Sequence, residues 1–244
     1  VTHLRPGDEV FGSYKGAFAE YACFPEKSLA SKPANLTFGE ASAIGVSAFT
    51  ALQALRDHGR VEPGHRVLIT GASGGVGTFA VQIAKALGAE VTGVCSTRNV
   101  EMVRSIGADH VVDYTREDFT EGELRYDLVL DNVGSRSMSD TRSVLTPTGT
   151  LLSNGAPVGG WFGGLANPLK ASIGSFFIRQ QGRPFVSTPN PEDLAELRDL
   201  AEAGKITPIL DATYPLSETP AAVAKVGAGH ARGKTTLTVE HAPG

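Results

Sequence analysis

The stretch Arg66-Val-Leu-Ile-Thr-Gly-Ala-Ser-Gly-Gly-Val-Gly77 decides the fold of this chain. Its opening residues form a short, mostly β-branched apolar run, which is typical of a buried strand. A glycine-rich turn follows at once. Beyond the turn, Phe79, Ile83 and Leu87 recur at helical spacing, and Gly88 stands where a helix would end. The stretch therefore predicts a strand, a tight turn and an amphipathic helix in direct succession.

The same alternation of strand and helix continues after Gly88. We expect strands at 90–96, 110–114, 126–131 and 150–154, with helices at 99–106 and 135–145 between them. These strands are too apolar to face water, so they belong in a parallel sheet that is covered on both faces. The predicted fold class is α/β, a doubly wound parallel sheet of the Rossmann kind.

The two ends of the chain have a mainly β character. Strands are expected at 9–11 and 19–24, as an antiparallel pair, and at 209–214 and 235–239. Helices are expected at 47–58, after Asn190 and after Pro220, where capping residues or helical spacing occur. The glycine-rich segment 157–183 fits either an apolar loop over a ligand or an irregular helix packed on the sheet.

The glycine turn suggests a phosphate ligand. Free backbone N–H groups, the lack of a Cβ and the positive end of a helix dipole all suit a pyrophosphate. The glycine spacing alone is weak, so the prediction of dinucleotide binding depends on the strand before the turn and the helix after it.

The end of the second strand favours NADPH over NADH. NAD-binding units usually carry an acid there to hold the ribose 2′-hydroxyl. Here the strand ends Cys95-Ser-Thr-Arg98, so hydroxyl groups and a guanidinium are available for a 2′-phosphate. The alternative is that Arg98 only caps the next helix.

Two rival chemistries fit the same turn. The pattern of Gly71, Ser73 and Gly75 matches the nucleophile elbow of α/β-hydrolases, with Asp211 and His230 in the required order behind it. No oxyanion motif precedes it, so this remains the weaker alternative. The turn is also similar to that of short-chain dehydrogenases, but the Tyr-x-x-x-Lys pair of that family is absent.

Composition excludes several function classes. The net charge of −4 gives no reason to expect a nucleic-acid or membrane partner, and no apolar run reaches the roughly 18 residues of a membrane span. The two cysteines, Cys23 and Cys95, lack metal-ligand spacing, and we expect buried, reduced thiols in a cytoplasmic protein.

Several ordered motifs together resemble the medium-chain dehydrogenase/reductases, in particular the zinc-free, NADPH-dependent quinone oxidoreductase branch. They are Pro6-Gly-Asp-Glu-Val-Phe-Gly12, Gly16-Ala-Phe-Ala-Glu-Tyr21, Ala48-Phe-Thr-Ala-Leu-Gln53, the run 71–88, Gly107-Ala-Asp-His-Val-Val-Asp-Tyr114, Asp131-Asn-Val-Gly134 and Gly229-His-Ala-Arg-Gly-Lys234. The resemblance implies reduction of quinones, enones or related carbonyl compounds, with no obligatory catalytic side chain. It also allows a homodimer.

The resemblance implies a set of cofactor-binding residues. They are Ser73, Gly74, Gly75 and Val76 at the pyrophosphate, Ser96 and Arg98 at the 2′-phosphate, Tyr114 at the adenosine, Asn132 and Val133 at the nicotinamide ribose, Gly155 at the next strand end, and Thr50 and Lys234 near the cofactor. Two alternatives stay open, because Tyr114 also fits a plain edge aromatic and Lys234 a solvated turn residue.

Zinc is not expected. The zinc-binding branch carries a four-cysteine site where this chain has only Ser13-Tyr-Lys-Gly-Ala-Phe18, and its catalytic cysteine falls in a segment similar to Ile44-Gly-Val-Ser47, which has no sulfur.

The resemblance also implies a division into domains. Residues 1–44 and 206–244 would belong to an incomplete GroES-like, mainly β substrate domain, and residues 45–205 to the Rossmann domain. Relatives carry several tens of residues before the segment similar to 1–12, so we expect a fragment of a longer reductase. The alternative function is that of a non-catalytic NADPH-binding relative.

Overall fold

The computed structural model describes residues 4–154, 181–184, 187–229 and 232–239. The chain divides into two compact units. The sheet unit comprises Gln53–Ser73 and Ala80–Val186, and the flanking unit comprises Val1–Leu52, Gly74–Phe79 and Ser187–Gly244. Along the chain, one division between the units falls within the glycine-rich turn, after Ser73.

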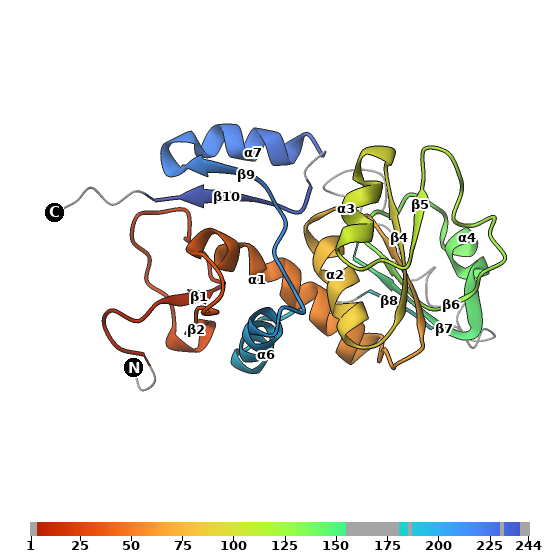
Figure 1. Ribbon diagram of the computed structural model, residues 1–244, viewed down its shortest axis with the longest axis horizontal. Helices are drawn as coiled ribbons and strands as arrows, with labels where there is room; N and C mark the ends of the chain where they lie inside the picture. The colour runs from red at the N-terminus through yellow and green to blue at the C-terminus, as the bar shows by residue number, and fades with distance from the viewer. Residues whose placement is uncertain (1–3, 155–180, 185–186, 230–231, 240–244) are drawn as a thin grey trace. The chain divides into compact units, whose positions relative to one another are not determined.

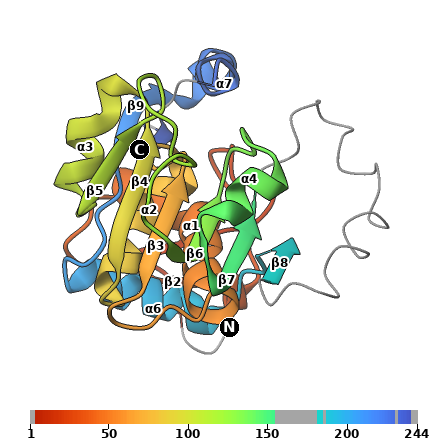
Figure 2. The same ribbon diagram turned by 90° about the vertical axis from the view of Figure 1, so that its right-hand side faces the viewer.

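The sheet unit contains a six-stranded sheet in the order β5-β4-β3-β6-β7-β8 (Figures 1 and 2). Its strands are β3 (Arg66–Thr70), β4 (Glu90–Cys95), β5 (His110–Asp113), β6 (Tyr126–Asp131), β7 (Leu145–Ser153) and β8 (Gln181–Pro184). Every neighbouring pair is parallel. Along the chain, β4 and β5 are added on one side of β3. The chain then crosses over, and β6, β7 and β8 are added on the other side of β3. The predicted Rossmann class is confirmed, and β8 is a strand that sequence reasoning did not assign.

Helices connect these strands. They are α2 (Gly75–Ala86), α3 (Val100–Ser105) and α4 (Met138–Ser143), with a 3-10 turn η3 (Thr97–Asn99) before α3 and a π-helical turn η2 (Ala54–His58) before β3. Within the sheet unit, α3 packs against β4 and β5, and α4 against β7 (Figure 2). Gly88 and Gly107 follow α2 and α3 with φ of 84° and 109°, so both predicted helix ends are confirmed.

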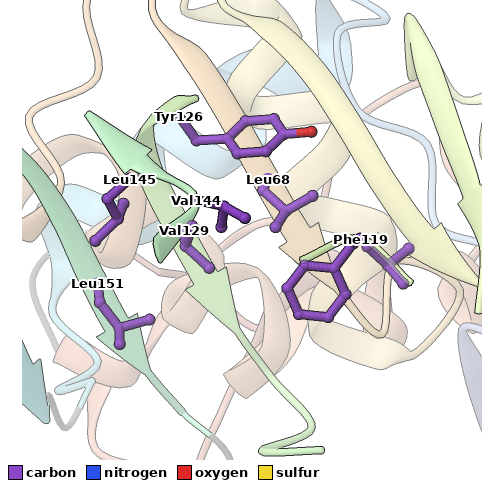
Figure 3. Packing of buried hydrophobic residues seen from close by; sticks show 8 residues of the cluster. Leu68, Phe119, Tyr126, Val129, Val144, Leu145 and Leu151 are labelled. Atoms are coloured by element: carbon purple, nitrogen blue, oxygen red, sulfur yellow. The ribbon is translucent and has the colours of Figure 1, made fainter. Parts of the chain in front are cut away.

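One face of the sheet is covered by a cluster of buried apolar side chains (Figure 3). The strand registers align Leu68 with Val129 and Val129 with Leu151, so these side chains point to the same face of neighbouring strands. The rest of the cluster is Val94, Phe119, Tyr126, Val144 and Leu145. This packing joins β3, β4, β6 and β7 on that face of the sheet.

On β4 a glycine permits a close approach of α3. A Cβ at Gly93 would lie 2.6 Å from Cγ1 of Val103 and 3.0 Å from the Cβ of Ala72. The missing side chain therefore sets the distance between α3 and the sheet.

The amino-terminal strands of the flanking unit differ from the prediction. β1 (Val10–Gly12) pairs antiparallel with β2 (Leu29–Ser31), which follows the turn η1 (Glu26–Ser28), whereas 19–24 is not a strand. Phe18 and Tyr21 are 72% and 82% exposed, so the apolar residues of that segment have no buried face to stabilise a strand. The prediction of a strand at 19–24 was wrong.

The helix expected from Ser47 begins earlier. α1 (Phe38–Gln53) starts with a capping box, in which Thr37 Oγ1 accepts from the backbone N–H of Glu40 at 3.3 Å and Glu40 Oε2 accepts from that of Thr37 at 2.8 Å. Gly45 interrupts the helix with non-helical angles (φ 14°, ψ −143°). The sequence pattern captured only the part after this interruption.

The remaining elements of the flanking unit agree with expectation. They are α6 (Pro191–Glu202), β9 (Leu210–Pro215), η6 (Leu216–Glu218), α7 (Thr219–Gly227) and β10 (Lys234–Thr238). Asn190 caps α6, since its Oδ1 accepts from the backbone N–H of Asp193 at 2.8 Å. β10 and β9 pair in parallel. The domain boundaries given above stay a prediction.

Candidate functional site

The loops after β3 and β6 meet at the carboxyl edge of the sheet. Gly71 has φ of 61°, and a Cβ there would lie 2.9 Å from Cγ2 of Val133. The strand order reverses between β3 and β6, and open parallel sheets bind their ligands at such a reversal. A candidate site therefore lies at these loops.

The loop after β6 is held by hydrogen bonds within the protein, some of them to Thr70 at the end of β3. Oδ1 of the buried Asp131 accepts from Thr70 Oγ1 at 2.6 Å and from the backbone N–H groups of Val133 and Gly134 at 3.2 Å and 3.0 Å. One carboxylate oxygen thereby fixes the turn that was predicted to flank the nicotinamide ribose.

Asn132 contributes its side chain to the same support. Its Nδ2 donates to the carbonyl of Thr70 at 3.0 Å, and its Oδ1 accepts from Nδ2 of Asn154 at 3.2 Å. The neighbouring Val133 is 48% exposed and has no such ties. Of the two residues predicted here, Val133 has an exposed side chain and Asn132 is bonded into the loop, and their contact with a cofactor stays a prediction.

At the end of β4, a buried asparagine connects two predicted site residues. Nδ2 of Asn99 donates to Ser73 Oγ at 3.0 Å and to Ser96 Oγ at 3.3 Å. Sequence reasoning missed Asn99, because an asparagine before a helix is usually read as a cap. Its side chain makes no capping hydrogen bond to α3. These two contacts were not visible without the fold.

The end of β5 adds a buried carboxylate, Asp113. Thr97 Oγ1 donates to its Oδ2 at 2.6 Å and Thr115 Oγ1 to its Oδ1 at 2.7 Å. The hydrogen bond from Thr97, followed by that from Thr115, holds the pKa of Asp113 below its usual value. Arg98 and Tyr114 follow these strand ends with exposed side chains.

The two cysteines differ in their surroundings. Burial, and then the charge of Asp113, raise the pKa of the Cys95 thiol to about 11, so it stays a thiol at neutral pH. Cys23 is exposed, which contradicts the expectation that both are buried. Residues 19–24 form no strand that would bury this side chain.

The start of α2 belongs to the flanking unit and has a cation beside it. A Cβ on Gly75 would lie 3.2 Å from both Cε and Nζ of Lys234 and 3.3 Å from Ser47 Oγ. Burial lowers the pKa of Lys234. Among the described residues its ammonium has no hydrogen-bond or ion-pair partner. Lys234 is therefore not a solvated turn residue.

Three other predicted site residues belong to the flanking unit. Gly74 and Val76 lie at the start of α2, and Thr50 forms hydrogen bonds within the unit. Gly74 precedes α2 and its carbonyl accepts from the backbone N–H of Thr78 at 3.0 Å, while Val76 is half-buried in the first turn. Thr50 Oγ1 donates to the carbonyl of Val46 at 2.8 Å and lies 2.9 Å from Ser187 Oγ. Gly155 lies outside the described residues.

The residues fit a dinucleotide phosphate. In the flanking unit these groups are a helix that begins with glycine and an ammonium without an anionic partner among the described residues, and in the sheet unit they are two serine hydroxyl groups; each kind of group binds phosphate oxygens. The hydrolase alternative lacks this support, since Ser73 contacts Asn99, and Asp211 pairs with Lys225 at 3.1 Å. His230 lies outside the described residues.

No group of three or more His, Cys, Asp or Glu side chains suited to a metal occurs in the part of the chain that the structure describes. Freedom from zinc stays a prediction. None of the described helices has the length and apolar character needed to cross a membrane.

Comparisons with known proteins identify the family. A zinc-binding dehydrogenase model matches residues 106–237. The mitochondrial NAD(P)H oxidoreductase RTN4IP1 of Mus musculus is 36% identical over 265 residues, covering 98% of this chain and 66% of that protein. The chloroplast envelope quinone oxidoreductase homolog of Arabidopsis thaliana is 32% identical over 248 residues, covering 96% and 73%. Among solved structures, the quinone oxidoreductase from Coxiella burnetii has a TM-score of 0.85 at 28% identity, covering 98% and 74%.

The chain thus spans about two thirds of the length of the curated mouse relative (66%). The names of these relatives place them in mitochondria and at the chloroplast envelope, so the cytoplasmic location stays a prediction, as does a homodimer. The family model, the relatives and the parallel sheet agree with the motifs read from the sequence. The chain belongs to the medium-chain dehydrogenase/reductase family of nicotinamide-dependent oxidoreductases, in its quinone oxidoreductase branch.

Proposed function

We propose that this protein is an NADPH-dependent oxidoreductase that reduces quinones, enones or related conjugated carbonyl compounds by hydride transfer, without zinc. The observation that carries the proposal is the ammonium of Lys234, which is partly buried and has no partner among the described residues, next to the glycine that begins α2. Desolvating an unpaired ammonium costs free energy, and a bound phosphate would offset that cost.

The backbone at the start of α2 complements this cation. Gly74 and Gly75 leave the first N–H groups of the helix open to a ligand, and the helix dipole adds positive potential there. Lys234 and the helix start would together bind the pyrophosphate. This interaction would be the same for NADPH and NADH, so it explains binding and not the choice of cofactor.

The choice of NADPH rests on the residues after β4. Ser96 and Arg98 follow the strand where an NAD-binding protein usually has an acid, and the side chain of Arg98 is exposed. Asp113, the carboxylate that contacts Thr97 in this segment, already accepts from Thr97 and Thr115 and is occupied within the protein. An anionic 2′-phosphate would thus meet donors at this strand end.

Bound NADPH would supply the hydride, and the protein would supply position and shielding. The turn fixed by Asp131 would hold Val133 at the nicotinamide end, where an apolar side chain excludes water from the reacting atoms. We assign no catalytic acid, because the resembling enzymes can take the proton from solvent. Quinones and enones fit this scheme, since both accept a hydride at an electron-poor carbon.

Cofactor titration tests the proposal. NADPH fluorescence should report binding to the full chain with a Kd below that of NADH. Arg98→Ala should weaken NADPH binding about tenfold, because a charge-assisted hydrogen bond is lost, and leave NADH binding unchanged. Arg104→Ala is the matched control, since Arg104 is an exposed arginine that pairs with Glu101 at 2.9 Å. Equal affinity for the two cofactors, unaltered in Arg98→Ala, would refute the NADPH assignment.

Turnover tests the remaining parts. Oxidation of NADPH should accelerate with a benzoquinone or an enone as acceptor, and should survive dialysis against a zinc chelator. Cofactor binding without turnover on any of these acceptors would favour the non-catalytic relative instead.

A further inference from the structure

We infer that Asn99 is a positioning residue that keeps the hydroxyl protons of Ser73 and Ser96 available for the phosphate oxygens of NADPH. The inference rests on the proposed function and assigns a device within it. All three residues belong to the sheet unit. Ser73 lies in the glycine-rich turn that follows β3, and Ser96 directly follows β4.

The geometry places one amide between two hydroxyl groups. Nδ2 of Asn99 lies 3.0 Å from Ser73 Oγ and 3.3 Å from Ser96 Oγ. An amide NH2 has two protons and donates both here, so each serine oxygen is an acceptor toward Asn99. Asn99 is 3% exposed, and solvent does not compete for these bonds.

The direction of these hydrogen bonds decides what the serines can do. A hydroxyl that accepts from an amide still has its own proton to donate elsewhere. Phosphate oxygens accept and do not donate. Asn99 therefore leaves both serines in the state that an anionic ligand needs, Ser73 toward the pyrophosphate and Ser96 toward the 2′-phosphate.

The oxygen of the Asn99 side-chain amide supports a functional role for this residue. Oδ1 of Asn99 is buried and has no hydrogen-bond partner within the described part of the chain. A buried acceptor without a partner destabilises the folded protein, so stability alone does not explain an asparagine at this position. The two donated bonds are what the residue provides.

A neighbouring hydroxyl shows the opposite arrangement. Thr97 lies between Ser96 and Arg98, but its Oγ1 donates to Asp113 Oδ2 at 2.6 Å. A carboxylate can only accept, so the proton of Thr97 points into the protein and is not available to a ligand. The contrast predicts what a carboxylate in place of Asn99 would do to Ser73 and Ser96.

Asn99→Asp is the decisive variant. The new carboxylate would accept from both serines and turn their protons away from the ligand. Each lost bond to a phosphate is expected to weaken binding about tenfold. The Kd of NADPH should rise about a hundredfold, because both serine bonds are lost. The Kd of NADH should rise only about tenfold, because NADH lacks the 2′-phosphate. The preference for NADPH should therefore fall about tenfold. Thr97→Val is the control and should leave this preference within about twofold.

A second series of variants, with alanine at Ser96 and Asn99, tests the inference even if Asn99→Asp does not fold. Ser96→Ala alone should reduce the NADPH preference about tenfold. Adding Asn99→Ala to Ser96→Ala should reduce the preference no further, because Asn99 acts on the 2′-phosphate through Ser96. Thermal unfolding of each variant without cofactor checks that the protein is folded.

The results separate this inference from the proposed function. If the unchanged protein prefers NADPH, and Asn99→Asp or the pair of alanine variants shifts the preference as stated, the inference is supported. If the preference is present but does not respond to Asn99, or if Asn99 and Ser96 act additively, the inference is wrong and the function stands. If the unchanged protein binds neither cofactor, both fail.

Discussion

Two loops at the same edge of the sheet use hydrogen bonds in opposite ways. In the loop after β6, Asp131 accepts from three donors and both ends of the Asn132 amide have protein partners. In the segment after β4, the oxygen of the buried Asn99 has no partner among the residues that the structure describes. Ser96 beside it and Ser73 in the turn after β3 both accept from Asn99 and have protons left to donate. The first loop is complete without a ligand, whereas the second has hydrogen-bonding capacity that a ligand can use.

The difference teaches how to distinguish supporting residues from contact residues in such a site. A polar side chain whose bonds are all made within the protein fixes the position of its neighbours, and one with a remaining donor is available to the cofactor. The same distinction applies to two lysines. Lys85 in α2 is bound by both carboxylate oxygens of Asp109, at 2.9 Å and 2.8 Å, while Lys234 has no partner among the described residues.

The largest effect should come from breaking the complete loop. Asp131→Ala would leave the Thr70 hydroxyl and the N–H groups of Val133 and Gly134 without their acceptor. We expect a loss of about 2–4 kcal/mol in the free energy of unfolding, since each buried donor without a partner costs roughly 1–3 kcal/mol and some regain water. Urea unfolding followed by circular dichroism measures it.

Asp140→Ala is the control for that variant. Asp140 is an exposed aspartate in the first turn of α4, and its loss should change stability by about 0.5 kcal/mol. Equal urea midpoints for Asp131→Ala and the unchanged protein would contradict the supporting role of the loop.

A smaller effect should follow from removing the unpaired lysine. Lys234→Met would remove a cation from the start of α2 and is expected to weaken NADPH and NADH binding equally, by about tenfold. Lys85→Met is the matched control, and there cofactor affinity should not change. An effect of Lys234→Met on NADPH alone would place this lysine at the 2′-phosphate instead.

The same lysine predicts a pH dependence. Its pKa in the folded protein lies below the usual value, so the folded state releases this proton at a lower pH than the unfolded state does. Between the two pKa values this group makes the unbound protein more stable as pH rises. Cofactor affinity should fall over the same range, because the neutral amine no longer attracts phosphate, and Lys234→Met should abolish that fall.

The smallest effect on stability should come from Asn154, which bonds to the loop after β6 from outside it. Asn154 is exposed, and Asn154→Ala removes one hydrogen bond of 3.2 Å to Asn132. We expect a stability loss of about 0.5 kcal/mol and an unchanged preference between NADPH and NADH. A shift in that preference would show that the two loops are not as separate in function as their hydrogen bonds indicate.

The sheet was predictable because local signals coincide there. The run of Arg66–Thr70, the glycine turn and the closing Gly88 each indicate the same strand-turn-helix unit, and each is confirmed. The strand at 19–24 was wrong because its apolar pattern has no buried face, and the start of α1 was missed because the capping box at Thr37 was not considered.

The site was predictable only in part for a different reason. The glycines and serines are recognisable by their order along the chain, whereas the hydrogen bond of Asn99 to Ser73 and the approach of Lys234 to Gly75 join residues far apart in sequence. No local pattern encodes such contacts. The resemblance to a family suggested Lys234, and nothing suggested Asn99.

The glycine in the middle of β4 gives this arrangement an evolutionary consequence. A side chain at Gly93 would collide with Val103 and push α3 outward, and α3 begins immediately after Asn99. If Asn99 positions the two serines as proposed, selection on cofactor choice would extend to this core position. A lineage that exchanged this glycine for alanine would shift α3 and, with it, the asparagine that precedes it.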